Sequence, residues 1–187
     1  MRLFLSLNPD PAALAGIREE QRRMRAGLAR FDDAVRWTRH ENTHLTLVFL
    51  GERETAAPVE EALAGFRFES FDLRIGGPGI FPDACRPAVL WLGIDDPGGR
   101  LARLQAGVEA ALSEVRSPED RPFHPHLTLG RVRPSRHRSR IGPAVSGLSL
   151  AAFIPWRVRS FFLMESRNGP EGVSYSILRE FSGENIL

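Results

Sequence analysis

A four-residue segment, His-Leu-Thr-Leu, occurs twice in the chain, at residues 44–47 and again at residues 126–129. With five histidines and five threonines among 187 residues, chance predicts far fewer than one His-x-Thr triplet. The two copies lie a little under half the chain apart, which is the separation expected of a duplicated lobe. The repeat is therefore the first candidate for a functional site.

Each copy lies in an apolar run typical of a β-strand, where successive side chains point to opposite faces. His44 and Thr46 then share one face of their strand, and His126 and Thr128 share one face of theirs. The leucines lie on the other face, where they can anchor each strand in the core of its lobe. We therefore expect both His-Thr pairs to face a cleft between two lobes.

Two histidines on opposite walls of a cleft can cleave a phosphoester without a metal. A neutral imidazole removes a proton from the attacking oxygen while an imidazolium protonates the leaving oxygen, and a pKa near 6.5 allows both forms near neutral pH. The hydroxyl groups of Thr46 and Thr128 can hydrogen-bond the phosphoryl oxygens, where negative charge develops.

Two other interpretations use the same residues. The four side chains could be ordinary strand residues with satisfied hydrogen bonds. Alternatively, His124 and His126, or His40 and His44, could contribute to a metal site. Neither motif contains an Asp, Glu or Cys to complete a ligand set, so the sequence favours a site without metal and assigns His124 a structural role.

The composition excludes several classes of enzyme. All 25 basic residues are arginine, so chemistry that needs a lysine amine is impossible here, including a Walker-type phosphate loop, a pyridoxal Schiff base and a lysine adenylate. Arginine binds phosphate well through paired hydrogen bonds, although a net charge of +2 does not by itself indicate nucleic acid. One cysteine fits a reducing cytosol. No window is apolar enough to span a membrane and the N-terminus lacks a signal-peptide pattern, so we expect a cytoplasmic protein.

Helices and strands alternate along the chain in two similar passes. Hydrophobic periodicity and end signals predict strands at residues 2–7, 44–50, 71–75, 88–94, 125–132, 156–165 and 173–178, and helices at residues 11–28, 58–64 and 101–115. The strand at residues 88–94 is expected to be central and buried on both faces. The pattern predicts a two-lobed α/β or α+β domain with largely antiparallel sheets.

The motifs and their flanks resemble the 2H phosphoesterase family, specifically its bacterial and archaeal RNA 2′,3′-cyclic phosphodiesterases, once called 2′-5′ RNA ligases or LigT-like proteins. The resemblance covers nearly the whole chain. It is carried by Arg2-Leu3-Phe4-Leu5, Trp37, His44-Leu45-Thr46-Leu47-Val48-Phe49-Leu50-Gly51, Gly79-Ile80-Phe81-Pro82, Arg86-Pro87, Val89-Leu90-Trp91-Leu92-Gly93 and residues 121–131.

This resemblance implies one bilobal 2H phosphoesterase domain over residues 1–187, of class α+β, with two pseudo-symmetric lobes flanking a central cleft, no metal and no cofactor. It also implies hydrolysis of a terminal RNA 2′,3′-cyclic phosphate to a 2′-phosphate. His126 would activate water, His44 would protonate the departing 3′ oxygen, and Thr46 and Thr128 would hold the phosphate. The reverse reaction, 2′-5′ ligation, would use the same two histidines with exchanged roles.

Arg131 lies just past the second motif, where the family also has an arginine, and could bind the phosphate or form a surface ion pair. Residues 131–140 contain five arginines punctuated by Pro and Ser, which predicts a loop that either collects RNA phosphates or is merely solvated. A terminal base could stack on Phe49, Phe81 or Phe123. Strict alternation places Phe49 on the leucine face, so Phe49 is the least favoured of the three.

The sequence therefore favours a cyclic phosphodiesterase acting as a monomer on RNA 3′ ends, among them tRNA halves, without contact to a membrane. A small cyclic nucleotide as substrate would use the same site. The alternative from another class is a module that binds RNA ends or nucleotides without turnover, and the presence of both an acid and a base argues against it.

Overall fold

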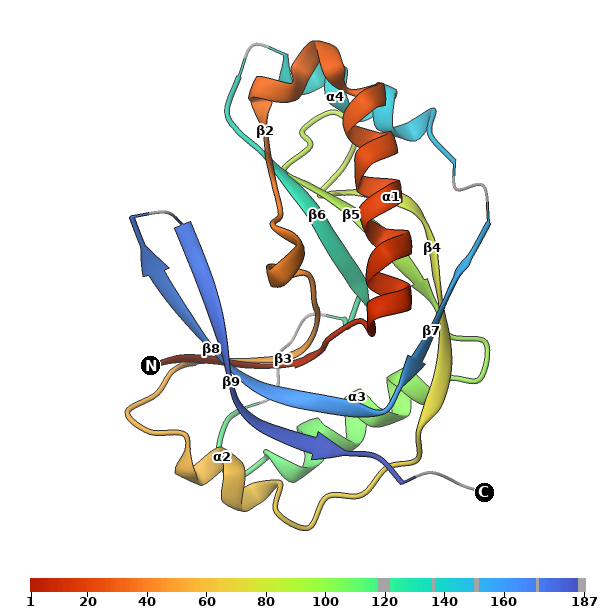
Figure 1. Cartoon of the computed structure of the whole chain (residues 1–187). Coiled ribbons are helices and arrows are strands. Elements are labelled where there is room, and N and C mark those ends of the chain that lie inside the picture. The colour runs from red at the N-terminus through yellow and green to blue at the C-terminus, as the bar shows by residue number, and fades with distance from the viewer. Residues whose placement is uncertain (118–121, 136, 150–151, 171, 185–187) are drawn as a thin grey trace.

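The computed structural model describes residues 1–117, 122–135, 137–149, 152–170 and 172–184, which form two β-sheets and the helices around them (Figure 1). The first sheet has the strand order β3-β1-β8-β9 and the second has the order β2-β6-β5-β4-β7. Every pairing between named strands is antiparallel. The strands are β1 (Arg2–Leu7), β2 (Val35–Trp37), β3 (Leu45–Glu52), β4 (Phe71–Phe81), β5 (Val89–Asp95), β6 (His126–Val132), β7 (Ile154–Val158), β8 (Ser160–Gly169) and β9 (Gly172–Ser182).

The two sheets have the same internal arrangement. The order β3-β1-β8-β9 corresponds to β6-β5-β4-β7, and the second sheet has one additional strand, β2, outside β6. Each sheet contains one copy of the His-Leu-Thr-Leu repeat, in β3 and in β6. The mixed α and β composition, the antiparallel sheets and the two similar halves confirm the predicted fold class.

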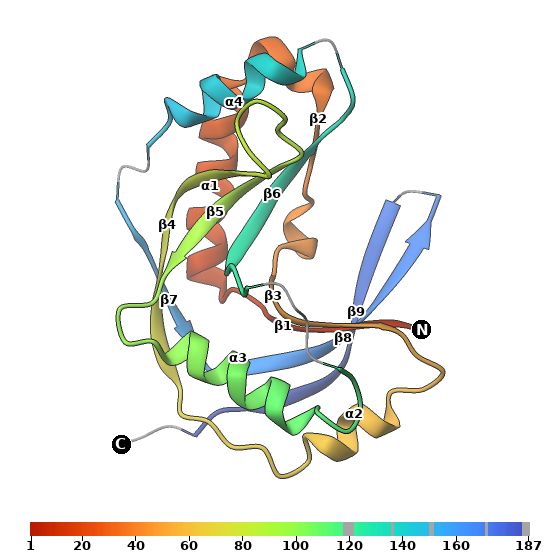
Figure 2. The same ribbon diagram turned by 180° about the vertical axis from the view of Figure 1, so that it is seen from behind.

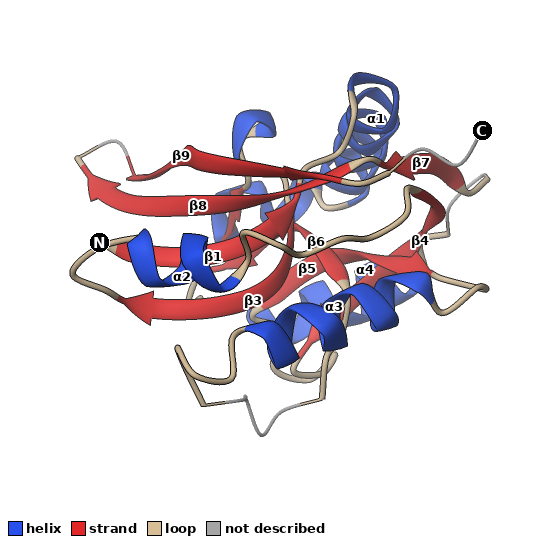
Figure 3. Cartoon of the chain, turned by 90° about the horizontal axis from the view of Figure 1, so that it is seen from below, coloured by secondary structure: helices blue, strands red, loops and turns tan. Residues whose placement is uncertain are grey.

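Helices cover the outer face of each sheet. They are α1 (Pro11–Gly27), α2 (Ala57–Ala62), α3 (Arg100–Ala111) and α4 (Arg138–Ser146), with short 3-10 helices η1 (Ala29–Ala34) and η2 (His40–Asn42). Figures 2 and 3 show α2 and α3 against the first sheet and α1 and α4 against the second, in agreement with the packing of α3 on β3, α1 on β7 and α4 on β4. Thus α1 follows a strand of the first sheet but packs on the second, and α3 does the reverse.

Local sequence explains the first two elements. In β1 the side chains of Leu3, Leu5 and Leu7 share one face and belong to the core, as alternation requires, and Phe4 and Ser6 on the other face are buried as well. The Asp10 side chain accepts a hydrogen bond from the Ala13 backbone N–H at 2.8 Å, and Pro11 opens α1, which together satisfy the usual preferences at a helix start. The core formed by these and other apolar side chains includes residues of both sheets.

Three predictions about the elements were wrong, and one strand was missed. Residues 156–165 form two strands, β7 and β8, that belong to different sheets. β5 is central but buried on one face only, because Leu90 and Leu92 are buried while Trp91 is partly exposed. Residues 131–140 are not one loop, since β6 continues to Val132 and α4 begins at Arg138. The three-residue strand β2 was not predicted, because so short a segment shows no periodicity.

No helix within the described part of the chain is long and apolar enough to cross a membrane.

Candidate active site

The two copies of the repeat meet where β3 of the first sheet approaches β6 of the second, with Cα atoms of the two strands within 8 Å. The charge of His126 lowers the pKa of His44, which also places the two imidazoles within electrostatic reach of each other. The predicted site is therefore assembled from both halves of one chain.

Each histidine ring is held by the same kind of hydrogen bond, from Nδ1 to a backbone oxygen two residues earlier. His44 Nδ1 lies 2.8 Å from the backbone oxygen of Asn42, and His126 Nδ1 lies 2.7 Å from that of His124. A carbonyl oxygen can only accept, so each Nδ1 must carry the hydrogen. Each Nε2 is then free to accept a proton in the neutral form or to donate one in the charged form, which is the property a general base or acid needs.

Aromatic rings hold each imidazole from the side. The His44 ring lies 4.9 Å from both Phe4 and Tyr175, measured between ring centroids, and meets Tyr175 edge-on at 84°. The His126 ring lies 5.0 Å from Phe81 at 85° and 6.2 Å from Trp91. The rings limit how far each imidazole can turn, while both histidines remain partly exposed.

Trp91 can lie beside His126 because its neighbour in the adjacent strand is a glycine. Trp91 pairs with Gly79 of β4 on one side and with Thr128 of β6 on the other. A Cβ atom at Gly79 would lie 2.1 Å from the indole Cη2, which no real side chain could tolerate. The indole of Trp91 can therefore lie across β4 only because residue 79 has no side chain.

Burial lowers the pKa of both histidines. For His44, loss of solvation is the largest cause, the bond to the Asn42 carbonyl opposes it, and the positive charges of His126 and Arg131 lower the pKa further. For His126 the causes are again burial, opposed by the His124 carbonyl, with contributions from the charges of Arg131 and His124. The free site therefore favours two neutral imidazoles, and a bound anion would favour protonation of either one.

A β-bulge follows the threonine in each repeat. In β6 the pairing with β5 moves from Trp91–Thr128 to Leu90–Gly130, which leaves Leu129 as an extra residue. In β3 the pairing with β1 moves from Ser6–Thr46 to Leu5–Val48, which leaves Leu47 as the extra residue. A bulge reverses the alternation beyond it. We call the face that carries His44, Thr46, His126 and Thr128 the histidine face, and the bulges return Phe49 and Arg131 to it.

The bulge in β6 is held by a buried glutamine of α1. Gln21 donates from Nε2 to the backbone oxygens of Leu129 and Thr38, both at 2.9 Å. The Leu129 oxygen also accepts from the Thr38 N–H at 2.8 Å. A carbonyl that a bulge removes from the ladder needs such partners when it is buried, so Gln21 stabilises the geometry that turns Arg131 toward the histidines.

Arg131 lies on the histidine face, and its role at the phosphate stays a prediction. Its charge reaches both His44 and His126, and among the described residues it has no ion-pair partner, which argues against the surface ion pair. Two other arginines of residues 131–140 differ: Arg138 donates to the Pro87 and Arg86 backbone oxygens, and Arg140 lies over the Phe31 ring. Residue 136, also an arginine, lies outside the described residues. The predicted arginine loop is thus divided between the site and the packing of α4.

The three phenylalanines proposed for base stacking have separate positions. Phe81 lies against His126, and Phe123 packs partly buried against the core. Phe49 is 55% exposed and pairs with Phe4, so the placement on the leucine face was wrong because of the bulge at Leu47.

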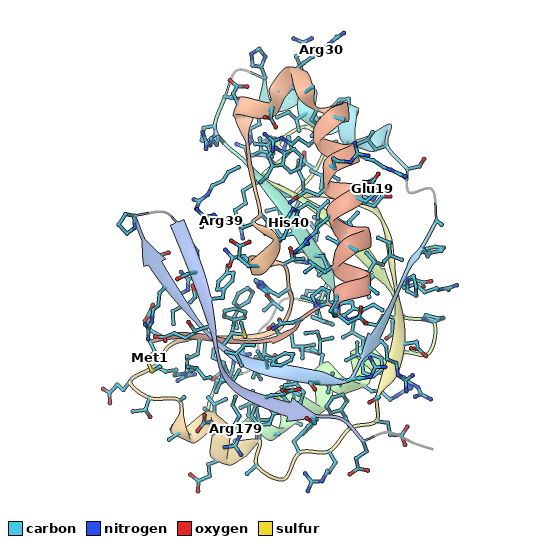
Figure 4. The ribbon with its side chains drawn as sticks, in the orientation of Figure 1. Met1, Glu19, Arg30, Arg39, His40 and Arg179 are labelled. Carbon is cyan, nitrogen blue, oxygen red and sulfur yellow. The ribbon has the colours of Figure 1, made fainter. Side chains whose placement is uncertain are left out.

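The histidines proposed for a metal site are not gathered into one. Among the described residues, no three His, Cys, Asp or Glu side chains are placed to hold a metal ion. His40 lies on η2, ahead of β3 (Figure 4), and His124 is exposed ahead of β6.

Sequence reasoning did not place Tyr175, Phe4 or Trp91 beside the histidines. Tyr175, the only tyrosine of the chain, lies in a strand that was predicted, but no local pattern shows that β9 reaches His44. Phe4 and Trp91 lie in strands adjacent to the repeats, and alternation alone could have placed Phe4 opposite the buried leucines of β1.

Known proteins similar to this chain share its sequence pattern and its fold. Residues 9–170 match the family model of the 2′-5′ RNA ligase superfamily. An RNA 2′,3′-cyclic phosphodiesterase of Archaeoglobus fulgidus is 34% identical over 183 residues, which cover 97% of this chain and 99% of that protein. A protein of the same name from Thermus thermophilus is 38% identical over 149 residues, covering 74% of this chain and 71% of the relative.

Two solved structures extend the likeness to the fold. The crystal structure of TT0787 of Thermus thermophilus superposes with a TM-score of 0.79 at 29% identity, covering 97% of each chain. The crystal structure of E. coli LigT complexed with 3′-AMP gives a TM-score of 0.70 at 26% identity, again covering 97% of each chain.

Proposed function

Because this chain belongs to the 2′-5′ RNA ligase superfamily, we propose that it is an RNA 2′,3′-cyclic phosphodiesterase, which opens a terminal cyclic phosphate with water to give a 2′-phosphate. The observation that supports this most directly is the duplicated His-x-Thr pair, whose two strands meet with each Nδ1 bound to a backbone carbonyl. The names of the relatives supply the substrate class.

In the proposed reaction each histidine transfers one proton, and Thr46, Thr128 and Arg131 bind the phosphate. His126 Nε2 takes a proton from water, whose oxygen attacks phosphorus. The bond from phosphorus to O3′ breaks, and His44 donates its proton to that oxygen. Thr46, Thr128 and Arg131 bind the non-bridging oxygens, whose negative charge grows in the transition state. The reverse direction would join a cyclic phosphate to a 5′-hydroxyl with the two histidines in exchanged roles.

The site needs no residue from a second copy, since both histidines come from one chain, and we propose that the protein acts as a monomer. RNA 3′ ends, including tRNA halves, and small cyclic nucleotides are the proposed substrates. The single cysteine supports a cytoplasmic location.

The test is to incubate the protein in EDTA with an oligoribonucleotide that ends in a 2′,3′-cyclic phosphate. We expect turnover, with the 2′-phosphate as the product isomer. A protein that binds this oligonucleotide without turnover would instead be an RNA-end-binding module, and a 3′-phosphate product would contradict the roles given to the two histidines.

Replacing either threonine by valine should lower kcat by up to about 10²–10³-fold, because one donor to the developing oxyanion is lost while the shape is retained. Single-turnover rates of Thr46→Val and Thr128→Val would measure the loss. Thr55→Val is the matched control, because Thr55 is exposed in the loop before α2. Unchanged rates in both threonine variants would remove them from the phosphate site.

The activity of the free enzyme should be greatest at a pH below 6.5. In a plot of kcat/KM the acidic limb reports the base and the alkaline limb reports the acid, and burial lowers the pKa of both histidines from 6.5. A bound phosphodiester anion raises the pKa of both histidines. The bell-shaped pH profile of kcat should therefore lie at higher pH than the bell-shaped profile of kcat/KM. Identical profiles centred above pH 7 would contradict this assignment.

A further inference from the structure

A second arginine lies directly beside Arg131 on the histidine face. Strand β2 pairs with β6 so that Arg36 is opposite Arg131. Opposite residues of an antiparallel pair point to the same face, and the bulge at Leu129 has already turned Arg131 to the histidine face. Arg36 is therefore on that face too, at the outer edge of the second sheet.

This pair is unusual among the cross-strand arginines of the protein. In the second sheet Arg74 is opposite Asp95 and Arg157 is opposite Asp72, and both pairs form salt bridges. Like charges directly opposite each other destabilise a sheet. Among the described residues neither Arg36 nor Arg131 has a carboxylate partner. Two adjacent guanidinium groups without a counter-charge form a site suited to an anion.

Arg36 lies on β2, the edge strand outside β6, whereas Arg131 lies on β6 itself. Arg131 is among the charges that lower the pKa of His44 and His126, whereas Arg36 is not among the described residues that do so. The Arg36 side chain lies against the tip of the β8–β9 hairpin, since a Cβ atom at Gly172 would be 2.4 Å from its Nη2. The hairpin is tied to η2 by the Asn42 side chain, which donates to the Val173 backbone oxygen at 2.9 Å, and it also carries Tyr175.

We propose that Arg36 binds the phosphodiester that joins the last two nucleotides of the RNA, next to the cyclic phosphate bound by Arg131. The inference rests on the proposed function and assigns its substrate class. The chain leaves the site along β2, between the second sheet and the β8–β9 hairpin, so the enzyme prefers an oligonucleotide to a mononucleotide. A nucleoside 2′,3′-cyclic phosphate has no internucleotide phosphodiester and does not use Arg36.

The test compares Arg36→Gln with the unchanged protein on two substrates: a dinucleotide ending in a 2′,3′-cyclic phosphate, and the matching nucleoside 2′,3′-cyclic phosphate. We expect kcat/KM for the dinucleotide to fall about 10- to 100-fold, as for loss of one charge-assisted hydrogen bond, with little change for the mononucleotide. The dependence of the dinucleotide reaction on salt should weaken, because one fewer phosphate is neutralised.

Arg30→Gln is the matched control, since Arg30 is an exposed arginine on η1 far from the hairpin (Figure 4). Equal losses on both substrates, or no loss on either, would overturn the role of Arg36. If the unchanged protein opens neither substrate, the proposed function itself fails and the inference falls with it. Arg36 is exposed and lies opposite a like charge, so the substitution should not lower the melting temperature.

Discussion

Replacing His126 by alanine lowers kcat by about 10²–10⁴-fold, and replacing His44 does the same, because each variant lacks the group that moves one of the two protons. The losses should not add in the double variant, since one missing proton transfer already blocks the concerted step. Single-turnover hydrolysis of an oligonucleotide that ends in a 2′,3′-cyclic phosphate measures both effects.

The neighbouring His124 provides the control for this prediction. Its side chain is exposed, and only its backbone oxygen binds His126, so His124→Ala retains that bond and should retain most of the activity. A zinc site built on His124 and His126 would behave differently: His124→Ala would be as damaging as His126→Ala, EDTA would stop the reaction and zinc would restore it. Full activity in His126→Ala would remove the two-histidine mechanism.

Replacing Arg131 by glutamine should lower kcat by about 10²–10³-fold, because the Arg131 guanidinium would donate hydrogen bonds to the phosphate oxygens on which negative charge grows. The charge of this guanidinium also reaches both histidines. The kcat of Arg131→Lys should lie between that of the unchanged protein and that of Arg131→Gln, since lysine retains the charge but loses the paired hydrogen bonds of the guanidinium. The loss should be the same for a mononucleotide and for an oligonucleotide.

This equal loss separates Arg131 from Arg36, whose replacement should affect the longer substrate alone. The pKa of the two histidines offers a second measurement. Without the positive charge of Arg131, both values should rise, and the kcat/KM profile should move to higher pH. An Arg131→Gln enzyme with unchanged rate and unchanged profile would contradict the assignment.

The sequence was sufficient to identify the repeat, the strands that carry it and the faces of its histidines and threonines. These features are local, since alternation and end signals act over a few residues. β1 coincides with residues 2–7, as predicted, and α1 begins at Pro11 behind its Asp10 cap.

The features that were missed depend on contacts between distant residues. The bulges at Leu47 and Leu129 are visible only in the strand pairing, and they reverse the face of Phe49 and Arg131. The side chain that holds the second bulge, Gln21, comes from α1. Alternation alone would therefore have placed Arg131 among the core leucines.

The division of residues 156–165 has the same cause. Trp156 and Val158 are buried in β7, and Phe161 and Leu163 are buried in β8, so the buried positions change from even to odd numbers across Arg159 and Ser160. This shift marks a break within the run, but only the strand pairing shows that its two parts belong to different sheets.

The pairing of β1 with β8 determines when the site can form in a growing chain. Arg2 is opposite Ser166, so β1 cannot complete its pairing until β8, far along the sequence, has been synthesised. Two strands alone, β1 and β3, make at best a marginal hairpin, and pairings this far apart in sequence form slowly. His44 is synthesised early, yet Tyr175 reaches it only after β9 has emerged. The surroundings of His44 are therefore complete only after β9 has been synthesised and has paired with β8.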